Sequence, residues 1–95
     1  MNKCYTYILK CSNDTYYTGS TKDIGRRLLQ HESGEGANYT RKHLPVKLVY
    51  LEIHSRIDFA FNREKQIQNW SQKKKEALIN GNLNQLIEYS KAKNH

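Results

Sequence analysis

Residues 4–19 contain the pattern that most restricts the fold, because it is typical of a β-hairpin. The run CYTYILKC at 4–11 is rich in aromatic and β-branched residues, and Tyr16-Tyr17-Thr18-Gly19 resumes that composition. The four residues between the two runs are Ser, Asn, Asp and Thr, which favour turns. We therefore expect two antiparallel strands joined by a short turn.

The remainder of the chain combines one more strand with helices. Residues 46–53, directly after the single proline Pro45, alternate in hydropathy as a third strand would. Helical spacing of apolar residues extends over 20–33, 55–70 and 71–79, and more weakly over 83–91. The order β-β-α-β-α-α, followed by the weaker closing helix, predicts an α+β fold. Its small three-stranded antiparallel sheet is flanked by helices.

The length of 95 residues fits a single domain. We expect residues 1–82 to form this domain and residues 83–95 to add a C-terminal helix and a frayed tail to it. Cys4 and Cys11 would lie about 23 Å apart on opposite faces of one strand, so we expect no disulfide. Reduced thiols, the lack of a signal peptide and the lack of a membrane-spanning apolar run predict a cytoplasmic protein, which we expect to be a monomer.

The charge of the chain points to its partner. Sixteen Lys and Arg against nine Asp and Glu give a net charge of +7, which attracts polyanions. We therefore expect a nucleic acid, most simply DNA, as the partner. The candidate phosphate contacts are Arg26, Arg41, Lys42, Lys47, Lys73, Lys74 and Lys75. Each basic cluster alone could also be an ordinary solvated surface.

Glu64 interrupts the apolar pattern of the helix predicted over 55–70. At about 100° per residue, the apolar stripe of that helix centres near Ile57, Ala60 and Phe61, and Glu64 falls inside it. Burying an isolated charge is costly. Glu64 should therefore form an ion pair, bind a metal or line a cleft, and the sequence leaves these three alternatives open.

Arg27 and His31 form a similar polar interruption in the helix predicted over 20–33. They lie four residues apart and flank the stripe of Ile24 and Leu28, so both should face the edge of the sheet. His31 taken alone could be a hydrogen-bonded core histidine. Together with Glu64 and the tyrosines of the hairpin, however, these residue types suit phosphodiester chemistry.

These residues also carry a resemblance to a known family. The order Tyr7, then Tyr17-Thr18-Gly19, then Arg27, then Glu64 resembles the motif of the GIY-YIG nuclease superfamily, in particular its small stand-alone bacterial members. The match covers about residues 4–80. The first motif reads Tyr5-Thr6-Tyr7 instead of Gly-Ile-Tyr, and the second reads Tyr-Thr-Gly instead of Tyr-Ile-Gly.

The resemblance implies a metal-dependent nuclease and assigns roles to the matched residues. Tyr17 would be the general base, Tyr7 its hydrogen-bonding partner and Arg27 the electrostatic stabiliser of the phosphate. Glu64 would hold one Mg²⁺ or Mn²⁺ ion, and Gly19 would be the motif glycine. Two further catalytic candidates are Lys22, which could polarise Tyr17 or the attacking water, and His31, which matches a common helix histidine.

Two functions of different classes follow from these patterns. The first is a metal-dependent endonuclease that cleaves DNA with low intrinsic sequence specificity, in DNA repair or recombination. The second is a non-catalytic nucleic-acid-binding or adaptor module that retains the nuclease fold. A protein-interaction module without a nucleic-acid partner fits the charge of +7 poorly.

Overall fold

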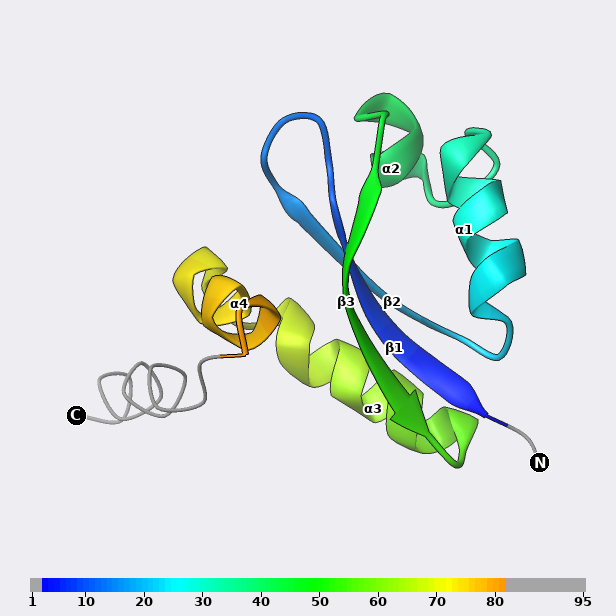
Figure 1. Cartoon of the computed structure of the whole chain (residues 1–95), viewed down its shortest axis with the longest axis vertical. Helices are drawn as coiled ribbons and strands as arrows, with labels where there is room; N and C mark the ends of the chain where they lie inside the picture. The colour runs from blue at the N-terminus through cyan, green and yellow to red at the C-terminus, as the bar shows by residue number, and fades with distance from the viewer. Residues whose placement is uncertain (1–2, 82–95) are drawn as a thin grey trace.

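The protein, in the computed structural model, is described for residues 3–81 and forms one sheet with helices on both faces (Figure 1). The strands are β1 (Cys4–Lys10), β2 (Tyr16–Thr21) and β3 (Lys47–His54), and the helices are α1 (Ile24–Glu32), α2 (Asn38–Lys42), α3 (Ile57–Gln68) and α4 (Gln72–Ile79). β1 is central in the antiparallel order β2-β1-β3. This confirms the predicted α+β class, while the helix and tail predicted over 83–95 lie outside the described residues.

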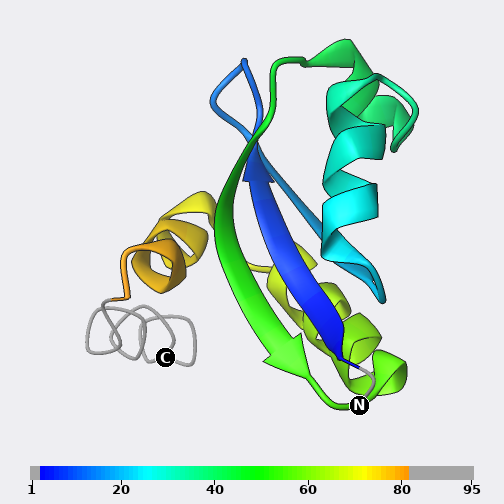
Figure 2. The ribbon, with the colours of Figure 1, turned by 45° about the vertical axis from the view of Figure 1, so that its right-hand side comes forward.

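Consecutive residues of β1 serve the two faces of the sheet. The Thr6 hydroxyl donates a hydrogen bond to the Ala60 carbonyl of α3 at 2.8 Å. The next residue, Tyr7, forms a hydrogen bond with His31 of α1 at 2.9 Å. The helices α1 and α2 thus cover one face, and α3 and α4 cover the other (Figure 2). The β1–β2 hairpin therefore carries side chains that contact the helices on each face of the sheet.

The apolar core lies on the α3 and α4 side. Ile8, Ile67 and Leu78 form its centre, and partly buried aromatic and aliphatic residues pack around them. In α3, however, the predicted stripe is partly wrong, because Ile57 and Phe61 are 37% and 48% exposed. The hydrogen bond from Thr6 to Ala60 holds the helix against the sheet on the Ala60 and Ile67 side, which turns Ile57 and Phe61 toward solvent.

Several boundaries differ from those predicted. Ser20 extends β2, and α1 begins only after Asp23, whose carboxylate accepts a hydrogen bond from the Arg26 backbone N–H at 3.1 Å. The five-residue α2 was not predicted, because no side chain caps its first turn. Ser71 does cap α4 as its position predicts, accepting from the Lys74 N–H at 3.2 Å. None of the helices within residues 3–81 is long and apolar enough to cross a membrane.

Candidate active site

Tyr7 is the centre of a polar cluster on the α1 face of the sheet. Its side chain is only 1% exposed, and its hydroxyl lies 2.9 Å from His31 Nε2. Arg27 Nε donates to the same hydroxyl at 3.4 Å and Arg27 Nη1 donates to Gln30 at 3.0 Å. The structure therefore brings Tyr7, Arg27 and His31 together, as expected from the sequence.

Gly19 leaves the space that the Tyr7 ring occupies. Gly19 is the residue directly opposite Tyr7 in the β1–β2 pairing. A Cβ atom at position 19 would overlap the Tyr7 hydroxyl and ring. The motif glycine is thus required by a close approach between two strands, and any side chain there would displace Tyr7.

The hydrogen bonds of His31 define its tautomer. Thr40 Oγ1 donates to the Ala37 carbonyl at 3.0 Å, so it accepts from His31 Nδ1 at 2.8 Å. Nδ1 therefore carries the proton, and Nε2 accepts the proton of the Tyr7 hydroxyl. Burial, together with the Arg27 charge, lowers the pKa of His31 to about 4, so the imidazole is neutral at pH 7.

The charges around Tyr7 follow from this arrangement. Burial raises the pKa of Tyr7 above its usual value of 10, so this phenol stays protonated. The hydrogen bond to Tyr7 raises the pKa of Arg27, and Tyr17 adds to the effect. The cluster is thus a neutral phenol and a neutral imidazole beside a permanent guanidinium cation.

Tyr17 completes the group on this face. It lies on β2, is partly buried, and its ring meets the His31 ring edge-on with the centroids 5.3 Å apart. Unlike Tyr7, it retains access to solvent at the edge of the sheet. Tyr17 is therefore the less buried of the two motif tyrosines.

Glu64 lies behind β2, on the α3 side. Its side chain is 13% exposed, and its carboxylate accepts hydrogen bonds from Ser20 at 2.6 Å and from Gln68 at 2.9 Å. The nearest cation in the described chain is the exposed Lys65, whose Nζ lies 4.0 Å from Oε2. Of the three alternatives left open by the sequence, the ion pair is present as this contact with an exposed lysine, and the metal and the cleft stay predictions.

The environment of Glu64 fits a divalent cation that takes few protein ligands. Within residues 3–81, no group of three or more His, Cys, Asp or Glu side chains is placed to hold a metal. Mg²⁺ commonly binds through one or two carboxylates and completes its shell with water and substrate phosphates. A single part-buried carboxylate at the edge of the sheet is compatible with that mode of binding.

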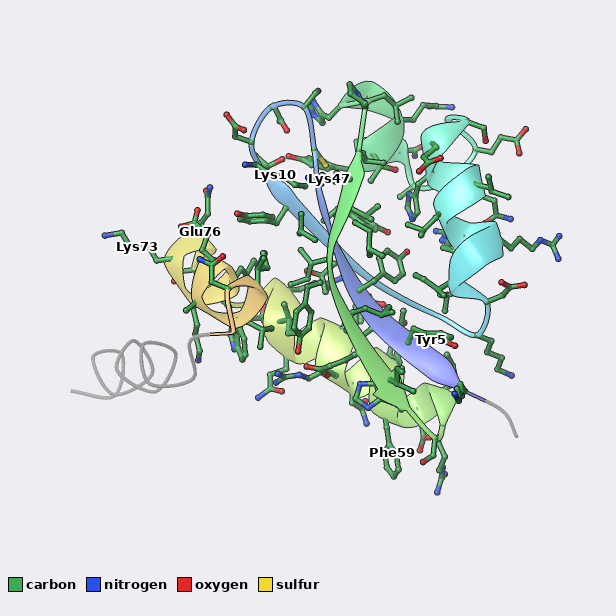
Figure 3. All side chains as sticks on the ribbon, viewed as in Figure 1. Tyr5, Lys10, Lys47, Phe59, Lys73 and Glu76 are labelled. Atoms are coloured by element: carbon green, nitrogen blue, oxygen red, sulfur yellow. The ribbon has the colours of Figure 1, made fainter. Side chains whose placement is uncertain are left out.

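The predicted phosphate contacts are spread around the molecule. Arg26 is exposed on α1, and Arg41 and Lys42 are exposed on α2. Lys22, which was predicted as a catalytic residue, lies in the turn between β2 and α1. Lys47 begins β3 beside Lys10, at the end of the sheet opposite Tyr5 (Figure 3).

The lysines of α4 are not part of the cluster around Tyr7. Lys73 lies on the other side of the sheet from α1, as Figure 3 shows. The ammonium group of Lys74 lies 4.3 Å from the centroid of the Trp70 ring. Burial lowers the pKa of Lys75. The structure therefore brings the motif residues together but leaves Lys73, Lys74 and Lys75 on the opposite face.

Four residues that touch the candidate site were not predicted. They are Gly36 and Thr40, which surround the His31 ring, and Ser20 and Gln68, which hold Glu64. Strand alternation could have placed Ser20 on the face opposite Gly19. The sequence near Gly36 and Thr40 carries no signal that links them to His31, because that contact depends on how α2 folds back on α1.

Comparisons with known proteins agree with this geometry. The family model of the GIY-YIG catalytic domain matches residues 3–77. The UPF0213 protein SSP2268 of Staphylococcus saprophyticus is 44% identical over 79 residues, which cover 83% of this chain and 96% of that protein. A UPF0213 protein of Syntrophus aciditrophicus is 47% identical over 83 residues, which cover 86% of this chain and 95% of the relative.

Solved structures match in the same way. The solution NMR structure of the UPF0213 protein BH0048 from Bacillus halodurans is 38% identical, with a TM-score of 0.55 over 84% of this chain and 85% of that one. That of the protein EF2693 from E. faecalis is 31% identical, with a TM-score of 0.58 over 85% and 86%. The chain therefore belongs to the GIY-YIG domain family, among the small UPF0213 proteins.

Proposed function

We propose that this protein is a divalent-metal-dependent endonuclease that hydrolyses DNA phosphodiester bonds with low intrinsic sequence specificity. One observation carries the proposal. The hydrogen-bonded group of Arg27, Tyr7 and His31 lies on one side of β2, and a carboxylate held by two hydrogen bonds lies on the other. A scissile phosphate at this edge would meet a cation, a phenol and a carboxylate at once.

Tyr17 is the proposed general base. Of the two motif tyrosines, Tyr17 is the one with access to solvent, whereas Tyr7 is buried and protonated. The phenolate form of Tyr17 is the one that can remove a proton from the attacking water. The Arg27 guanidinium beside it stabilises the negative charge of that form. Lys22, in the turn after β2, assists by drawing the attacking water or the phosphate into position.

Arg27 is the proposed electrostatic stabiliser of the phosphate. Its Nε is directed to Tyr7 and one Nη to Gln30, so the guanidinium is held in place before substrate arrives. His31 accepts from Tyr7 and so keeps the Tyr7 hydroxyl oriented. Tyr7 and His31 thereby position Arg27 and do not need to exchange protons with the substrate.

Glu64 is the proposed ligand of one Mg²⁺ or Mn²⁺ ion. When bound, such an ion neutralises charge on the phosphate and acts as a Lewis acid. Ser20 and Gln68 hold the carboxylate in place with one hydrogen bond to each of its oxygens. The +7 charge and the exposed basic residues supply binding through phosphates, which carries little sequence information. A role in DNA repair or recombination in the cytoplasm is consistent with such binding and is part of the proposal.

The test compares cleavage by the wild type and by two Glu→Gln variants. Purified protein is incubated with labelled single-stranded, duplex and branched DNA in Mg²⁺, Mn²⁺ or EDTA. We expect cleavage only with metal, and its loss in Glu64→Gln but not in Glu35→Gln, whose carboxylate is exposed on a loop. Cleavage in EDTA, or undiminished cleavage by Glu64→Gln, would disprove the proposal, and DNA binding without cleavage would favour the non-catalytic module.

Thermal melts separate the proposed ligand role of Glu64 from a structural one. Because a bound cation stabilises the folded state by mass action, metal should raise the melting temperature of the wild type and not that of Glu64→Gln. Without metal, the two proteins should melt at nearly the same temperature. Equal responses to metal would remove Glu64 as the ligand.

A further inference from the structure

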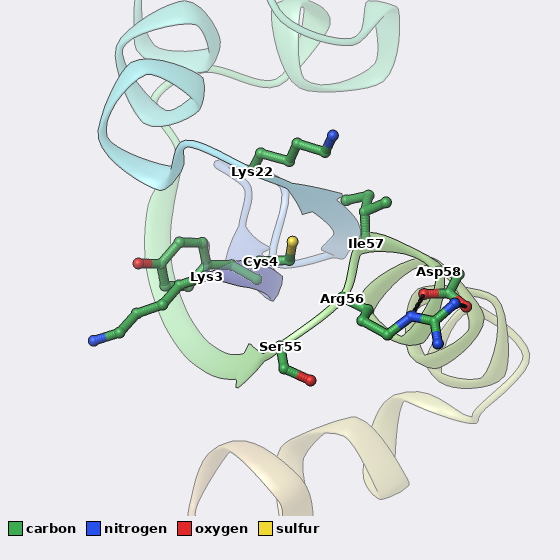
Figure 4. Close-up of a pocket in the computed structure, with 8 residues that line it drawn as sticks. Lys3, Cys4, Lys22, Ser55, Arg56, Ile57 and Asp58 are labelled. Atoms are coloured by element: carbon green, nitrogen blue, oxygen red, sulfur yellow. Dashed lines mark hydrogen bonds and ion pairs between the residues drawn. The ribbon is translucent and has the colours of Figure 1, made fainter. Parts of the chain in front are cut away.

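A pocket of about 1000 Å³ opens at the end of the sheet where three segments meet. The start of β1 contributes Lys3 and Tyr5, the turn between β2 and α1 contributes Lys22, and residues 55–58 contribute the junction of β3 and α3 (Figure 4). Figure 4 shows Cys4 in the middle of this ring of residues. The volume lies at the upper end of the range for small-molecule sites and accommodates a nucleotide.

The pocket carries a net positive charge that the described chain does not neutralise. Arg56 and Asp58 form a two-point ion pair, with Nε–Oδ1 and Nη2–Oδ2 distances of 3.0 Å each, so their charges cancel. Lys3 and Lys22 are exposed and form no ion pair with another residue of the range 3–81. The carboxylate next to Lys22, that of Asp23, accepts a hydrogen bond from the Arg26 backbone N–H and does not line the pocket. Figure 4 shows the two lysines on opposite sides of Cys4, so they place uncompensated positive charge on two sides of the pocket, which favours an extended polyanion.

The walls of the pocket suit more than a bare ion. Tyr5 contributes a partly buried aromatic ring, and Ile57 contributes an apolar side chain that is 37% exposed. An aromatic ring and an aliphatic surface beside ammonium groups match the alternation of flat base and charged phosphate in a nucleic-acid strand. The lining therefore indicates a nucleotide unit of a strand.

The pocket lies on the same side of α3 as Glu64. Ile57, Phe61 and Glu64 are spaced i, i+4 and i+7, so they share one side of the helix. Ile57 and Glu64 are about 10 Å apart along the axis, at about 1.5 Å per residue. One strand of B-DNA advances about 3.4 Å per nucleotide. A strand that passes Glu64 would thus reach the pocket within about three nucleotides.

We propose that this pocket binds a second, non-scissile phosphate of the nucleic-acid strand, through Lys3 and against the Tyr5 ring. The phosphate belongs to a linkage within about three nucleotides of the one cleaved. This inference rests on the proposed function, because it assumes that the substrate strand crosses the β2 edge. Lys3 becomes a substrate-positioning residue, one that the motif does not include.

The first test measures binding in EDTA, so that no cleavage is required. Fluorescent 12-mer oligonucleotides carry a single uncharged methylphosphonate linkage, moved one position at a time. Lys3→Gln should weaken binding of the unmodified strand about fivefold and lower the salt slope by about one phosphate. Lys10→Gln, at the other end of β1, is the matched control and should retain the wild-type salt slope.

The decisive result is non-additivity at one linkage. If Lys3 contacts a particular phosphate, one methylphosphonate position should weaken the wild type and have no further effect on Lys3→Gln. Additive losses at every position would overturn the proposal. Amide NMR spectra should in addition show shifts of Lys3, Cys4 and Ile57 when an oligonucleotide binds, and spectra of Lys3→Gln would report its folding directly.

Two further arms identify the source of the phosphate. Binding of oligonucleotides with a 5′-hydroxyl and with a 5′-phosphate is compared. Equal binding indicates a phosphate of an internal linkage, and tighter binding of the 5′-phosphate form indicates a phosphate at the strand end. Either result supports the site. Shifts at the pocket with inorganic phosphate but none with an oligonucleotide would overturn it. If Lys3→Gln weakens binding but the protein never cleaves DNA, the pocket proposal is supported and the nuclease proposal is contradicted. If the protein cleaves DNA but neither Lys3→Gln nor a neutral linkage changes binding or cleavage, the nuclease proposal is supported and the pocket proposal is contradicted.

Discussion

Each face of the sheet carries a hydrogen-bonded group of a tyrosine, a histidine and an arginine, but only one of the two groups contains a glutamate. On the α1 face the hydrogen bonds run in one direction, from Arg27 to Tyr7 to His31 and on to Thr40. Glu64 stays outside that chain, behind β2. On the α3 face, the glutamate is at the centre of the group.

On the α3 face, the charged side chains pair with Glu52. The Glu52 carboxylate accepts from Tyr50 at 2.5 Å, pairs with His54 at 3.0 Å and forms a two-point ion pair with Arg63 at 3.0 Å. Burial and Glu52 raise the pKa of Tyr50 to about 12. Burial opposes ionisation of Glu52, but the hydrogen bonds from Arg63 and Tyr50 lower the pKa of that carboxyl below its usual value.

The difference separates a structural network from a site that can act. Every charge around Glu52 has a protein partner, so this group fastens α3 to β3. On the opposite face the guanidinium is oriented by neutral groups and retains its charge for an outside anion. The same residue types therefore serve stability when their charges are paired internally and chemistry when the pairing is left to a ligand.

The largest difference between the two faces should appear when one arginine is removed from each. Arg27→Ala should lower the single-turnover cleavage rate about 10²–10³-fold with a small loss of stability. Arg63→Ala should retain the cleavage rate within a few-fold but lower the free energy of unfolding by about 2 kcal/mol, because it leaves the part-buried Glu52 without its main partner. Urea unfolding and cleavage assays of both variants measure the two effects, and equal losses of activity would erase the distinction.

The pH dependence of stability probes the neutral imidazole of the α1 face. The folded-state pKa of His31 is about 4 and its unfolded value about 6.5, so the unfolded state binds more protons between these values. The contribution of neutral His31 to the free energy of unfolding is therefore complete above pH 6.5. It declines by about 3 kcal/mol as the pH falls to 4, and about 2 kcal/mol of this is lost by pH 5.

Urea unfolding at pH 7, 6 and 5 measures this slope. Its matched control is His43→Gln, since His43 lies outside the hydrogen-bonded chain and its removal should leave the slope unchanged. His31→Asn should flatten it. A flat wild-type profile between pH 6.5 and 5 would mean that His31 is as accessible to protons as in the unfolded chain.

A smaller effect is expected from adding one methyl group beneath Tyr7. Gly19→Ala should cost about 1–3 kcal/mol of stability by overpacking and should slow cleavage, because the new Cβ displaces the hydroxyl that holds Arg27. Gly25→Ala is the matched control. A Cβ there meets only the Asp23 carboxylate, at 3.8 Å, so this helical position should tolerate alanine or gain stability. Loss of activity in Gly19→Ala alone would show that the packing of Gly19 against Tyr7 supports the Arg27 group, and equal activity of the two variants would contradict this.

Local patterns predicted the elements better than the contacts between them. The hairpin, the third strand and α4 follow from alternation and from capping residues such as Ser71, which act within a few residues of chain. The motif tyrosines, Arg27 and Glu64 were selected as candidates because their order resembles the family motif, and their roles stay predictions. The exposure of Phe61, the clasp of Thr40 on His31 and the Glu52 network were not, because each depends on the angle at which a helix meets the sheet.

The contact between Gly19 and Tyr7 also protects the chain against folding errors. A shift of the hairpin by one residue would place Thr18 or Ser20 opposite Tyr7, and either side chain would occupy the volume of the phenol ring. The same shift would turn Tyr17 and Ser20 to the wrong faces and so detach both halves of the candidate site at once. A hairpin in the wrong register therefore cannot bury Tyr7. Only the correctly paired hairpin can pack against both α1 and α3.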